Sequence, residues 1–408
     1  MSAPAVPPEI DSPAFRHSGR GPLSLALMDA RNRTLYLFAQ HLAAGTAEAG
    51  HDEAGPPAWQ VAGQAAWFAE WWILRNPQCA LGAAGGPDGL RLAPLVPQAD
   101  DWFHPQSPPA GSDQPPDPDT VRAYMLQQLE ATLDLLERAD ETEPGLHLYR
   151  AALCHEDARA EQLLVLAQHR GVALPLQVPA PMAHRPALDL PATRWTLGSG
   201  PDGFAPALER PAHPVDVPPF EIDAQPVSWS QYVEFVDDGG YDRPELWHPR
   251  GWSWLEAGGR RAPRHIEQIG VASGAVLQTL FGKPTRLAAT QPVMHVSWWE
   301  ADAWARWSGR RLPTEVEWEI AAVTASRRGF RWGDVHEWTA GTLRPWPGFV
   351  PDAWAVGSPM DPQPHWGSAR VRRGASFATP TRQKHPRARS FASPEHDHDF
   401  VGFRTCAL

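Results

Sequence analysis

Cysteine is scarce in this chain of 408 residues, which contains only Cys79, Cys154 and Cys406. Their odd number and wide spacing exclude both a disulfide framework and a paired-cysteine metal knuckle. Long apolar runs are also missing, since no stretch reaches the roughly 18 residues that a membrane-spanning helix needs. The N-terminal stretch MSAPAVPPEIDSPAF lacks the basic and apolar segments of a signal peptide. We therefore expect a soluble, cytoplasmic protein with no membrane partner.

An excess of basic residues is missing as well. The chain has 36 Lys and Arg residues against 47 Asp and Glu residues, for a net charge of −11. This balance argues against a nucleic-acid partner held by general electrostatics. Tryptophan and proline are abundant instead, with 20 and 45 residues, which far exceeds ordinary usage. Their abundance favours a fold of packed aromatic side chains and irregular, proline-set loops.

The first half of the chain has the apolar spacing of α-helices. In the segment 119–139, Asp119 is a candidate N-cap and apolar residues follow at steps of three and four. The segment 146–171 ends on Gly171, a typical helix-terminating residue. Long helices joined by Pro- and Gly-rich loops predict a four-helix bundle over residues 21–170. The predicted helices cover residues 21–42, 59–76, 119–139 and 146–171.

Three proline-rich segments flank or interrupt these helices. Residues 1–20 are expected to be disordered or extended. Residues 101–119 form a long loop that we expect to be mobile or wrapped on the surface. Residues 171–192 are predicted to be the linker between two domains, because their proline density forbids a helix.

The second half, residues 193–408, has a different sequence pattern. Short strand-like pieces such as RWTLG and FEIDAQPVSW alternate with turns. Helices are predicted near residues 298–309 and 314–325, and in the latter Thr314 and Glu317 form a capping box. The remainder is Trp-, Gly- and Pro-rich loop. The fold class is therefore α+β, with a helical bundle followed by a mixed domain of little regular structure.

A series of motifs in the second half resembles a known family. In order, they are HVSW, GRRLPTE-x-EWE, EWTA, RG-x-SF and GFR, spread over residues 292–408. This series resembles the formylglycine-generating-enzyme fold, a C-type-lectin-like domain, and the resemblance covers roughly Trp195 to Leu408. Formylglycine-generating enzymes proper use two cysteines close together in sequence. Because Cys406 is the only cysteine of this half, their cysteine chemistry is not expected.

The first half resembles the DinB-type bundle of the ergothioneine sulfoxide synthases. Those enzymes join a sulfur donor to the imidazole C2 of hercynine (trimethylhistidine) with non-haem iron and dioxygen. The segment 220–243 and the C-terminal tail from Gly374 resemble more closely the selenoneine synthase branch, which uses a selenosugar donor. The resemblance thus implies an iron(II) oxidoreductase acting on hercynine, a selenosugar and dioxygen. The alternatives are a sulfur-transferring synthase and a metal-free betaine-binding protein.

The resemblance implies three iron-binding histidines, one on the second helix and an H-x-x-x-H pair on the fourth. Alignment on AWF-x-EWW-x-LRN places Gln64, His155 and Arg159 at these positions. Arginine cannot bind a metal because its guanidinium stays protonated. A rearranged site would use His155, Gln64 and a carboxylate such as Glu161. The other reading is a polar network of His155, Arg159 and Glu161 in a bundle without metal.

Two further departures from the sulfoxide synthases concern the donor and proton transfer. The loop 101–119 contains none of the arginines that grip a donor carboxylate in those enzymes. Their active-site tyrosine is also missing, because the last tyrosine is Tyr241 and the corresponding segment offers Trp346. Both departures are compatible with a neutral, sugar-linked donor. We therefore include Trp346 with His155 and His336 among the candidate catalytic residues, His336 also being a candidate substrate contact.

The candidate substrate-binding residues follow the RG-x-SF motif. Phe391 could meet a trimethylammonium group by a cation–π contact, although core packing explains it equally well. Ser390 could hydrogen-bond a carboxylate, and arginines could anchor one. In contrast, we expect His295, Glu315, Glu317 and Glu319 to be structural and the HDHD tract, residues 396–399, to be a solvated turn. The substrate-binding candidates are Phe377, Arg382, Arg389, Ser390 and Phe391.

Overall fold

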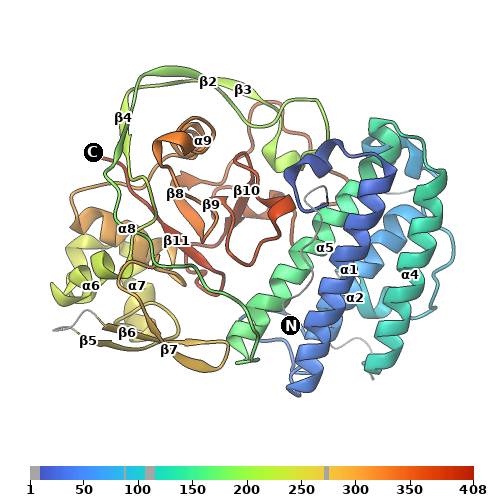
Figure 1. Ribbon diagram of the computed structural model, residues 1–408, viewed down its shortest axis with the longest axis horizontal. Coiled ribbons are helices and arrows are strands. Elements are labelled where there is room, and N and C mark those ends of the chain that lie inside the picture. Colours follow the sequence, from blue (N-terminus) through green and yellow to red (C-terminus); the bar gives the residue numbers. More distant parts are fainter. Residues whose placement is uncertain (1–9, 87–88, 106–114, 271–274) are drawn as a thin grey trace.

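The computed structural model describes residues 10–86, 89–105, 115–270 and 275–408. Four long helices form a bundle on one side of the molecule (Figure 1). They are α1 (Arg20–Ala43), α2 (Ala58–Ala69), α4 (Pro118–Arg138) and α5 (Glu143–His169). The helical turns continue beyond α2 as a π-helical segment, Glu70–Leu74. The predicted bundle is confirmed.

The helix ends show where local prediction failed. The N-cap of α4 is Asp117, whose side chain accepts hydrogen bonds from the backbone N–H groups of Asp119 and Thr120. Asp119 therefore lies in the first turn, and its prediction as N-cap is wrong. The reason is Pro118, whose fixed φ suits the first helical position and moves the helix start two residues upstream. At the end of α5, Gly171 has a φ of 69° and terminates the helix as predicted.

The segments around the bundle contain little regular structure. A short 3-10 helix covers Pro13–His17, within the segment predicted to be disordered or extended, whose first nine residues lie outside the described part. The loop after α2 contains the one-turn helix α3 (Ala99–Phe103), and residues 106–114 of the loop likewise lie outside the described part. The segment 171–187 has no helix, as its prolines predict.

The C-terminal domain is organised around one four-stranded sheet in the order β10-β9-β8-β11. Strand β11 is parallel to β8, and the other pairs are antiparallel. Helices α8 (Trp298–Trp307) and α9 (Glu315–Thr324) were predicted, and the capping box of α9 joins Thr314 and Glu317 as expected. The strands are β8 (His336–Thr342), β9 (Arg370–Gly374), β10 (Arg389–Ala392) and β11 (Val401–Phe403).

Smaller elements surround this sheet. The strand-like reading of FEIDAQPVSW is only partly right, because β4 ends at Ile222 and a capping box at Ser228 starts helix α6. Helix α7 was not predicted either. These elements are β1 (Leu188–Leu190) paired with β4 (Phe220–Ile222), β2 (Thr193–Leu197) paired with β3 (His213–Val217), the three-stranded sheet β5 (Ile266–Gly270), β6 (Ala275–Leu280) and β7 (Lys283–Leu287), and helices α6 (Trp229–Asp237) and α7 (Pro249–Gly258).

Tryptophans and paired charges fill the interior of this domain. The side chains of Trp229, Trp318 and Trp338 are fully buried, as the aromatic-rich composition predicts. The buried Arg404 guanidinium pairs with Glu337 at 2.5 Å. A buried charge is costly unless it is paired, so such pairs fix the positions of the groups around them. The three cysteines are free.

Helix α5 joins the two domains, lying between the rest of the bundle and the sheet (Figure 1). It packs against α1 and α2 on one side. On the other side, the Arg382 guanidinium binds Asp157 of α5 at 2.7 Å, with both side chains buried. Most residues along α5 are therefore buried, and polar side chains on it must find partners inside the protein.

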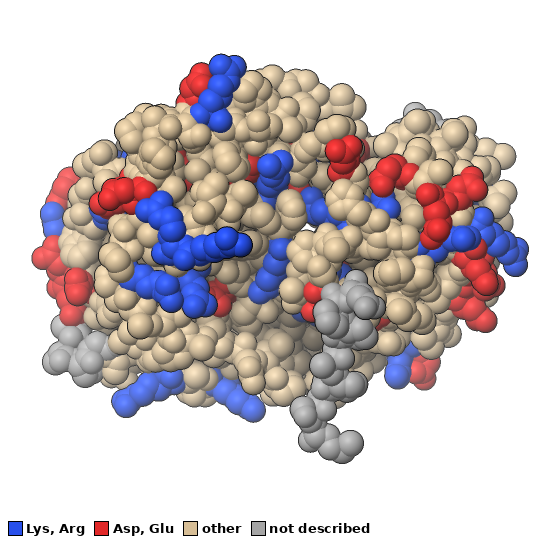
Figure 2. Space-filling model, turned by 45° about the horizontal axis from the view of Figure 1, so that its top comes forward, with Lys and Arg blue, Asp and Glu red and all other residues tan. Residues whose placement is uncertain are grey.

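On the face drawn in Figure 2, several basic side chains gather left of the centre, whereas acidic side chains lie mainly at the left edge and on the right. In the described part of the chain, the helices are too short or too polar to cross a membrane.

Candidate active site between the helical bundle and the C-terminal domain

A cavity of about 450 Å³ lies between α5 and the C-terminal domain. We call it the inter-domain cavity. Helix α5 contributes Arg159 and Glu161, strand β8 contributes His336, and strand β10 contributes Phe391. Further lining comes from the loop 349–362 and from polar side chains of the sheet. These side chains include Arg372, Arg389 and Ser390, and the loop after β10 adds His396 and Asp399.

A second cavity of about 430 Å³ lies between the bundle and residues 353–359 of the C-terminal domain. We call it the bundle cavity. It is lined by Gln64, by the aromatic side chains that follow it on α2, and by His104 and His155. Arg159, Trp354 and Pro359 line both cavities. The two cavities are therefore neighbours that meet at these three residues.

His155 is held rigidly in the wall of the bundle cavity. Its ring stacks on Phe68, with 4.2 Å between ring centroids and an interplanar angle of 13°. Its Nδ1 atom is buried and has no hydrogen-bond partner in the described structure. Burial and the neighbouring charge of Arg159 hold the pKa of His155 well below its ordinary value. The imidazole is therefore neutral, which is the form that binds metals and accepts protons.

Arg159 is four residues further along the same helix. Its side chain is buried, with a residue exposure of 6%. No hydrogen bond or ion pair joins it to any other described residue, and its buried Nε atom is without a partner. Burial lowers the pKa of Arg159 to about 10, and no nearby carboxylate offsets this effect. A guanidinium with this pKa still carries its charge at neutral pH.

Glu161 belongs to the inter-domain cavity and does not line the bundle cavity with His155 and Gln64. Its carboxylate accepts hydrogen bonds from Ser376 Oγ at 2.8 Å and from Thr379 Oγ1 at 2.9 Å. His336 Nε2 lies 2.9 Å from the same carboxylate. The structure therefore separates Glu161 from the other two residues predicted to bind metal.

His336 is the predicted catalytic residue that lines the inter-domain cavity. Because Nε2 donates to Glu161, the neutral ring has its lone pair on Nδ1. That Nδ1 atom is buried and unpaired within the described structure. A carboxylate that fixes a histidine through one nitrogen leaves the other free for proton transfer. The pair Glu161–His336 thus has the arrangement of an acid–base group.

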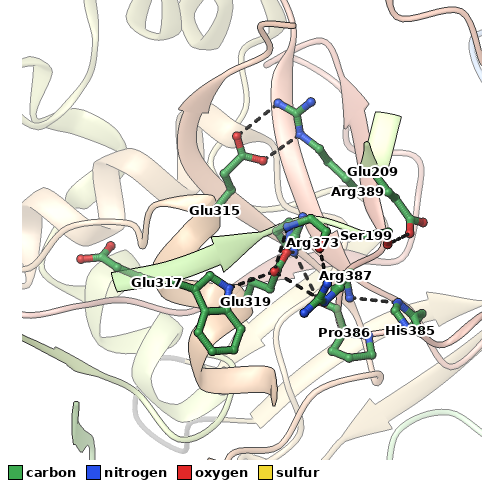
Figure 3. Close-up of polar contacts among 12 residues, drawn as sticks. Ser199, Glu209, Glu315, Glu317, Glu319, Arg373, His385, Pro386, Arg387 and Arg389 are labelled. Carbon is green, nitrogen blue, oxygen red and sulfur yellow. Dashed lines mark hydrogen bonds and ion pairs between the residues drawn. The ribbon is translucent and has the colours of Figure 1, made fainter. Parts of the chain in front are cut away.

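Of the five predicted substrate-binding residues, Arg389, Ser390 and Phe391 line the inter-domain cavity. The Arg389 Nε atom lies 2.7 Å from Glu315, and its guanidinium lies over Trp346 at 4.5 Å from the ring centroid. Figure 3 shows this pair beside the cluster of Glu319, Arg373 and Arg387. Arg389 is therefore largely engaged by protein groups, although its buried Nη1 atom has no partner in the described structure.

The remaining candidates do not line either cavity. Arg382 binds Asp157 through two nitrogens and Asp29 through a third, so it has little capacity left for a substrate. Phe377 packs against Phe400, with 4.6 Å between ring centroids. Trp346 is buried and donates a hydrogen bond to Glu315 at 3.2 Å.

The HDHD tract is not the solvated turn that we predicted. Asp397 is buried and binds Arg264 at 2.7 Å as well as Arg260. Asp399 pairs with Arg372 and with His396, and the latter pair has a separation of 3.0 Å. The acidic residues are drawn inward because arginines from other segments need partners.

Most lining residues were not predicted, and His104 and Trp354 are two of them. His104, in the loop after α2, packs against Trp67 with 5.0 Å between ring centroids and lines the bundle cavity. Trp354 lines both cavities and packs edge-on against Phe68 at 6.0 Å. The segment around Trp354, PDAWAVG, matches no motif. Only the fold brings these loops to the cavities.

The residues around the bundle cavity do not fit a three-imidazole metal site. Within the described ranges, no group of three or more His, Cys, Asp and Glu side chains is placed to hold a metal ion. The cavity offers two imidazoles, His104 and His155, and the weak amide oxygen of Gln64. The cationic guanidinium of Arg159 lies in the same wall and opposes the binding of another cation.

The fold and motifs define a class of protein. Residues 189–334 match the family described as "Sulfatase-modifying factor enzyme 1-like domain". A formylglycine-generating enzyme of Mycobacterium tuberculosis is 34% identical over 166 residues, which is 36% of this chain and 54% of that protein. The C-terminal domain is therefore of the formylglycine-generating-enzyme type.

Two relatives align over most of the chain. The hercynine oxygenase of Mycolicibacterium smegmatis is 32% identical over 389 residues, covering 82% of this chain and 87% of that protein. The hercynine oxygenase of Mycolicibacterium thermoresistibile is 31% identical over 444 residues, covering 94% of each. The chain belongs to the hercynine oxygenase family.

Proposed function

We propose that this protein is an oxidoreductase that modifies hercynine in the inter-domain cavity. The observation that carries the proposal is the alignment with a hercynine oxygenase over 94% of both chains. The cavity supports it, because the aromatic side chains of Phe349, Trp354 and Phe391 line its wall. Aromatic faces attract quaternary ammonium groups. Hercynine carries such a group next to a carboxylate and an imidazole.

In this proposal, His336 is the proton-transfer residue. Replacing the hydrogen at the imidazole C2 of hercynine requires that a proton be removed. His336 Nδ1 accepts it, while Glu161 holds the ring through Nε2 and stabilises the charge that develops. Ser376 and Thr379 keep the Glu161 carboxylate in place.

The donor that we propose is a selenosugar, with dioxygen as the oxidant. When a C–Se bond forms between a selenolate donor and the hercynine C2–H group, the pair loses one proton and two electrons, and dioxygen takes up the two electrons and is reduced to hydrogen peroxide. Two observations support a donor without a carboxylate: the segment 101–119 contains no arginine, and the last tyrosine of the chain is Tyr241. Tyr241 is buried and bonded to Glu300 at 2.6 Å. A sulfur donor is the alternative within the same class.

Iron(II) is the cofactor that the family resemblance implies, but the bundle cavity does not supply its three histidines. We therefore assign no step to iron. The same observation favours a second candidate function, which is binding of a betaine without its oxidation. His155 and Gln64 would then be parts of a polar wall and not metal ligands.

The experiment compares reaction and binding in the same purified chain. Hercynine and dioxygen are supplied with a selenosugar, with cysteine or with γ-glutamylcysteine, with and without added iron(II), and products are identified by mass spectrometry. Formation of a C–Se product from the selenosugar alone supports the proposal, whereas a product from cysteine or γ-glutamylcysteine alone establishes the sulfur alternative. Binding of hercynine without any product establishes the second candidate. Equal affinity for hercynine and histidine would contradict a betaine site of any kind.

Variants of His336 test the proton-transfer step. His336→Asn is expected to bind hercynine within a few-fold of the wild type and to lose product formation by roughly 10² to 10⁴-fold. His184→Asn, in the exposed linker, is the matched control. Unchanged turnover of His336→Asn would exclude His336 as the proton acceptor.

A further inference from the structure

Arg159 is a buried cation of the site that has no carboxylate partner in the described structure. Arginine side chains in a protein interior ordinarily pair with carboxylates, because an unpaired buried charge is costly. The other two arginines that line the inter-domain cavity follow this rule, since Arg372 binds Asp399 and Arg389 binds Glu315. Arg159 is equally buried and has no such partner among the described residues. A role in binding an anionic ligand is the simplest physical account of this difference.

The acidic residues nearest to Arg159 in sequence are engaged elsewhere. Asp157 is bound by Arg382, at 2.7 Å. Glu161 accepts hydrogen bonds from the C-terminal domain and is held by His336. Residues two positions apart point to different sides of a helix, so neither can turn to Arg159 without breaking these contacts.

The position of Arg159 makes it accessible to a small molecule. It lines both the inter-domain cavity and the bundle cavity, and Trp354 does the same. A guanidinium binds a carboxylate through two parallel hydrogen bonds, and an indole face attracts a quaternary ammonium group. These two groups of the protein therefore match the two charged groups of an amino-acid betaine.

We propose that Arg159 is the receptor for the substrate carboxylate: its guanidinium binds the carboxylate of hercynine where the two cavities meet. This inference rests on the proposed function for the identity of the ligand. It also accounts for the mismatch with a three-histidine metal site, because the third position of that site carries a cation that attracts anions.

The test is a calorimetric titration of the full 408-residue chain with two probes. One probe is hercynine, and the other is trimethylhistamine, which has the same imidazole and trimethylammonium groups but no carboxylate. The wild type is expected to prefer hercynine. Arg159→Gln is expected to bind hercynine on the order of 10²-fold more weakly, because a buried charge pair is lost. Its affinity for trimethylhistamine is expected to stay within a few-fold of the wild type.

Two variants control for folding and for charge. Arg159→Lys keeps the cation without the bidentate geometry, so it is expected to retain part of the preference for hercynine. Arg306→Gln removes a half-exposed arginine of α8 that pairs with Asp302, and both affinities should be unchanged. A third variant, Arg159→Met, is expected to raise the thermal midpoint of the ligand-free protein, because an uncompensated buried charge is removed.

The results separate the two proposals. If Arg159→Gln keeps the wild-type preference for hercynine over trimethylhistamine, the carboxylate receptor is overturned while the proposed function stands. If hercynine does not bind but imidazole acetate or histidine raises the thermal midpoint only when Arg159 is present, the receptor is supported and the proposed substrate is overturned. If no carboxylate has an Arg159-dependent effect, the receptor is overturned in every form.

Discussion

The change Glu161→Gln tests the contact that joins helix α5 to His336 of the C-terminal domain. In the wild type, the Glu161 carboxylate accepts hydrogen bonds from Ser376 at 2.8 Å and Thr379 at 2.9 Å, and His336 Nε2 lies at 2.9 Å. The three donors all belong to the C-terminal domain. Glutamine has nearly the same shape but replaces one acceptor oxygen with an NH₂ donor.

The expected loss in the free energy of unfolding follows from the number of hydrogen-bond donors that lose their acceptor. A hydrogen bond to a charged acceptor contributes about 1.5–3 kcal/mol, and a neutral one about 0.5–1.5 kcal/mol. The amide oxygen of glutamine keeps one donor at the neutral strength, and one or two donors are left without an acceptor. We therefore expect Glu161→Gln to lower the free energy of unfolding by about 2–4 kcal/mol. Because Glu161 is partly exposed at the cavity, with a side-chain exposure of 19%, the lower half of this range is the more realistic.

The loss of stability caused by Glu161→Gln must also depend on pH. Burial alone would raise the pKa of Glu161, but the contact with His336 and the hydrogen bonds from Ser376 and Thr379 hold it below its ordinary value of 4.5. A carboxylate with a lowered pKa stabilises the folded state above its unfolded pKa, and this stabilisation is lost as the pH falls through the folded pKa. The difference between wild type and Glu161→Gln is therefore full at pH 6–7 and shrinks below about pH 4.5.

Urea unfolding at several pH values, followed by tryptophan fluorescence, measures this difference. Glu130→Gln on the exposed face of α4 is the matched control and should change stability by less than about 0.5 kcal/mol. A Glu161→Gln protein as stable as the control at pH 7 would refute the reasoning. So would a loss of stability that is the same at pH 4 and pH 7, because it could not come from the charge of Glu161.

Three further predictions follow from the buried polar groups. Arg382→Gln leaves Asp157 as an uncompensated buried charge and should lower the free energy of unfolding by about 3–5 kcal/mol in urea titrations; a loss below 1 kcal/mol would contradict the pair's role. Burial raises the pKa of Cys154 to about 12, so a thiol reagent at pH 8 should label Cys154 only after denaturant is added. Protein purified without chelator should contain well under one iron per chain, and His155→Ala should leave this content unchanged; stoichiometric iron that disappears in His155→Ala would reverse the conclusion on the metal.

The parts of the fold that sequence predicted well are those fixed by local chemistry. The bundle helices follow from apolar spacing, and the start of α9 follows from the capping box of Thr314 and Glu317. The start of α4 was missed because two aspartates flank a proline and only the backbone geometry decides between them. Helix α6 was missed because a short amphipathic segment between prolines also reads as a strand.

The candidate site was harder to predict, because its residues come together only through the packing of two domains. Motifs identified His155 and His336, yet they could not show that these residues line different cavities. Spacing along α5 gave a partial hint. Glu161 lies roughly 200° around the helix from Arg159, so the two side chains leave the helix in different directions. Loop residues such as His104 and Trp354 carried no periodicity from which their position could be derived.

The polar residues of α5 lead to one conclusion about the site. Glu156 is bound by Arg31 at 2.6 Å, Asp157 by Arg382 at 2.7 Å, and Glu161 by His336 at 2.9 Å. Every carboxylate in this stretch has a partner from another segment, whereas the cation of Arg159 has none in the described structure. An unpaired arginine at position 159 lowers the stability of the folded protein, because an apolar residue at this position would make the protein more stable. The exception is therefore explained by binding of an anion, and this makes Arg159 the most informative position to change.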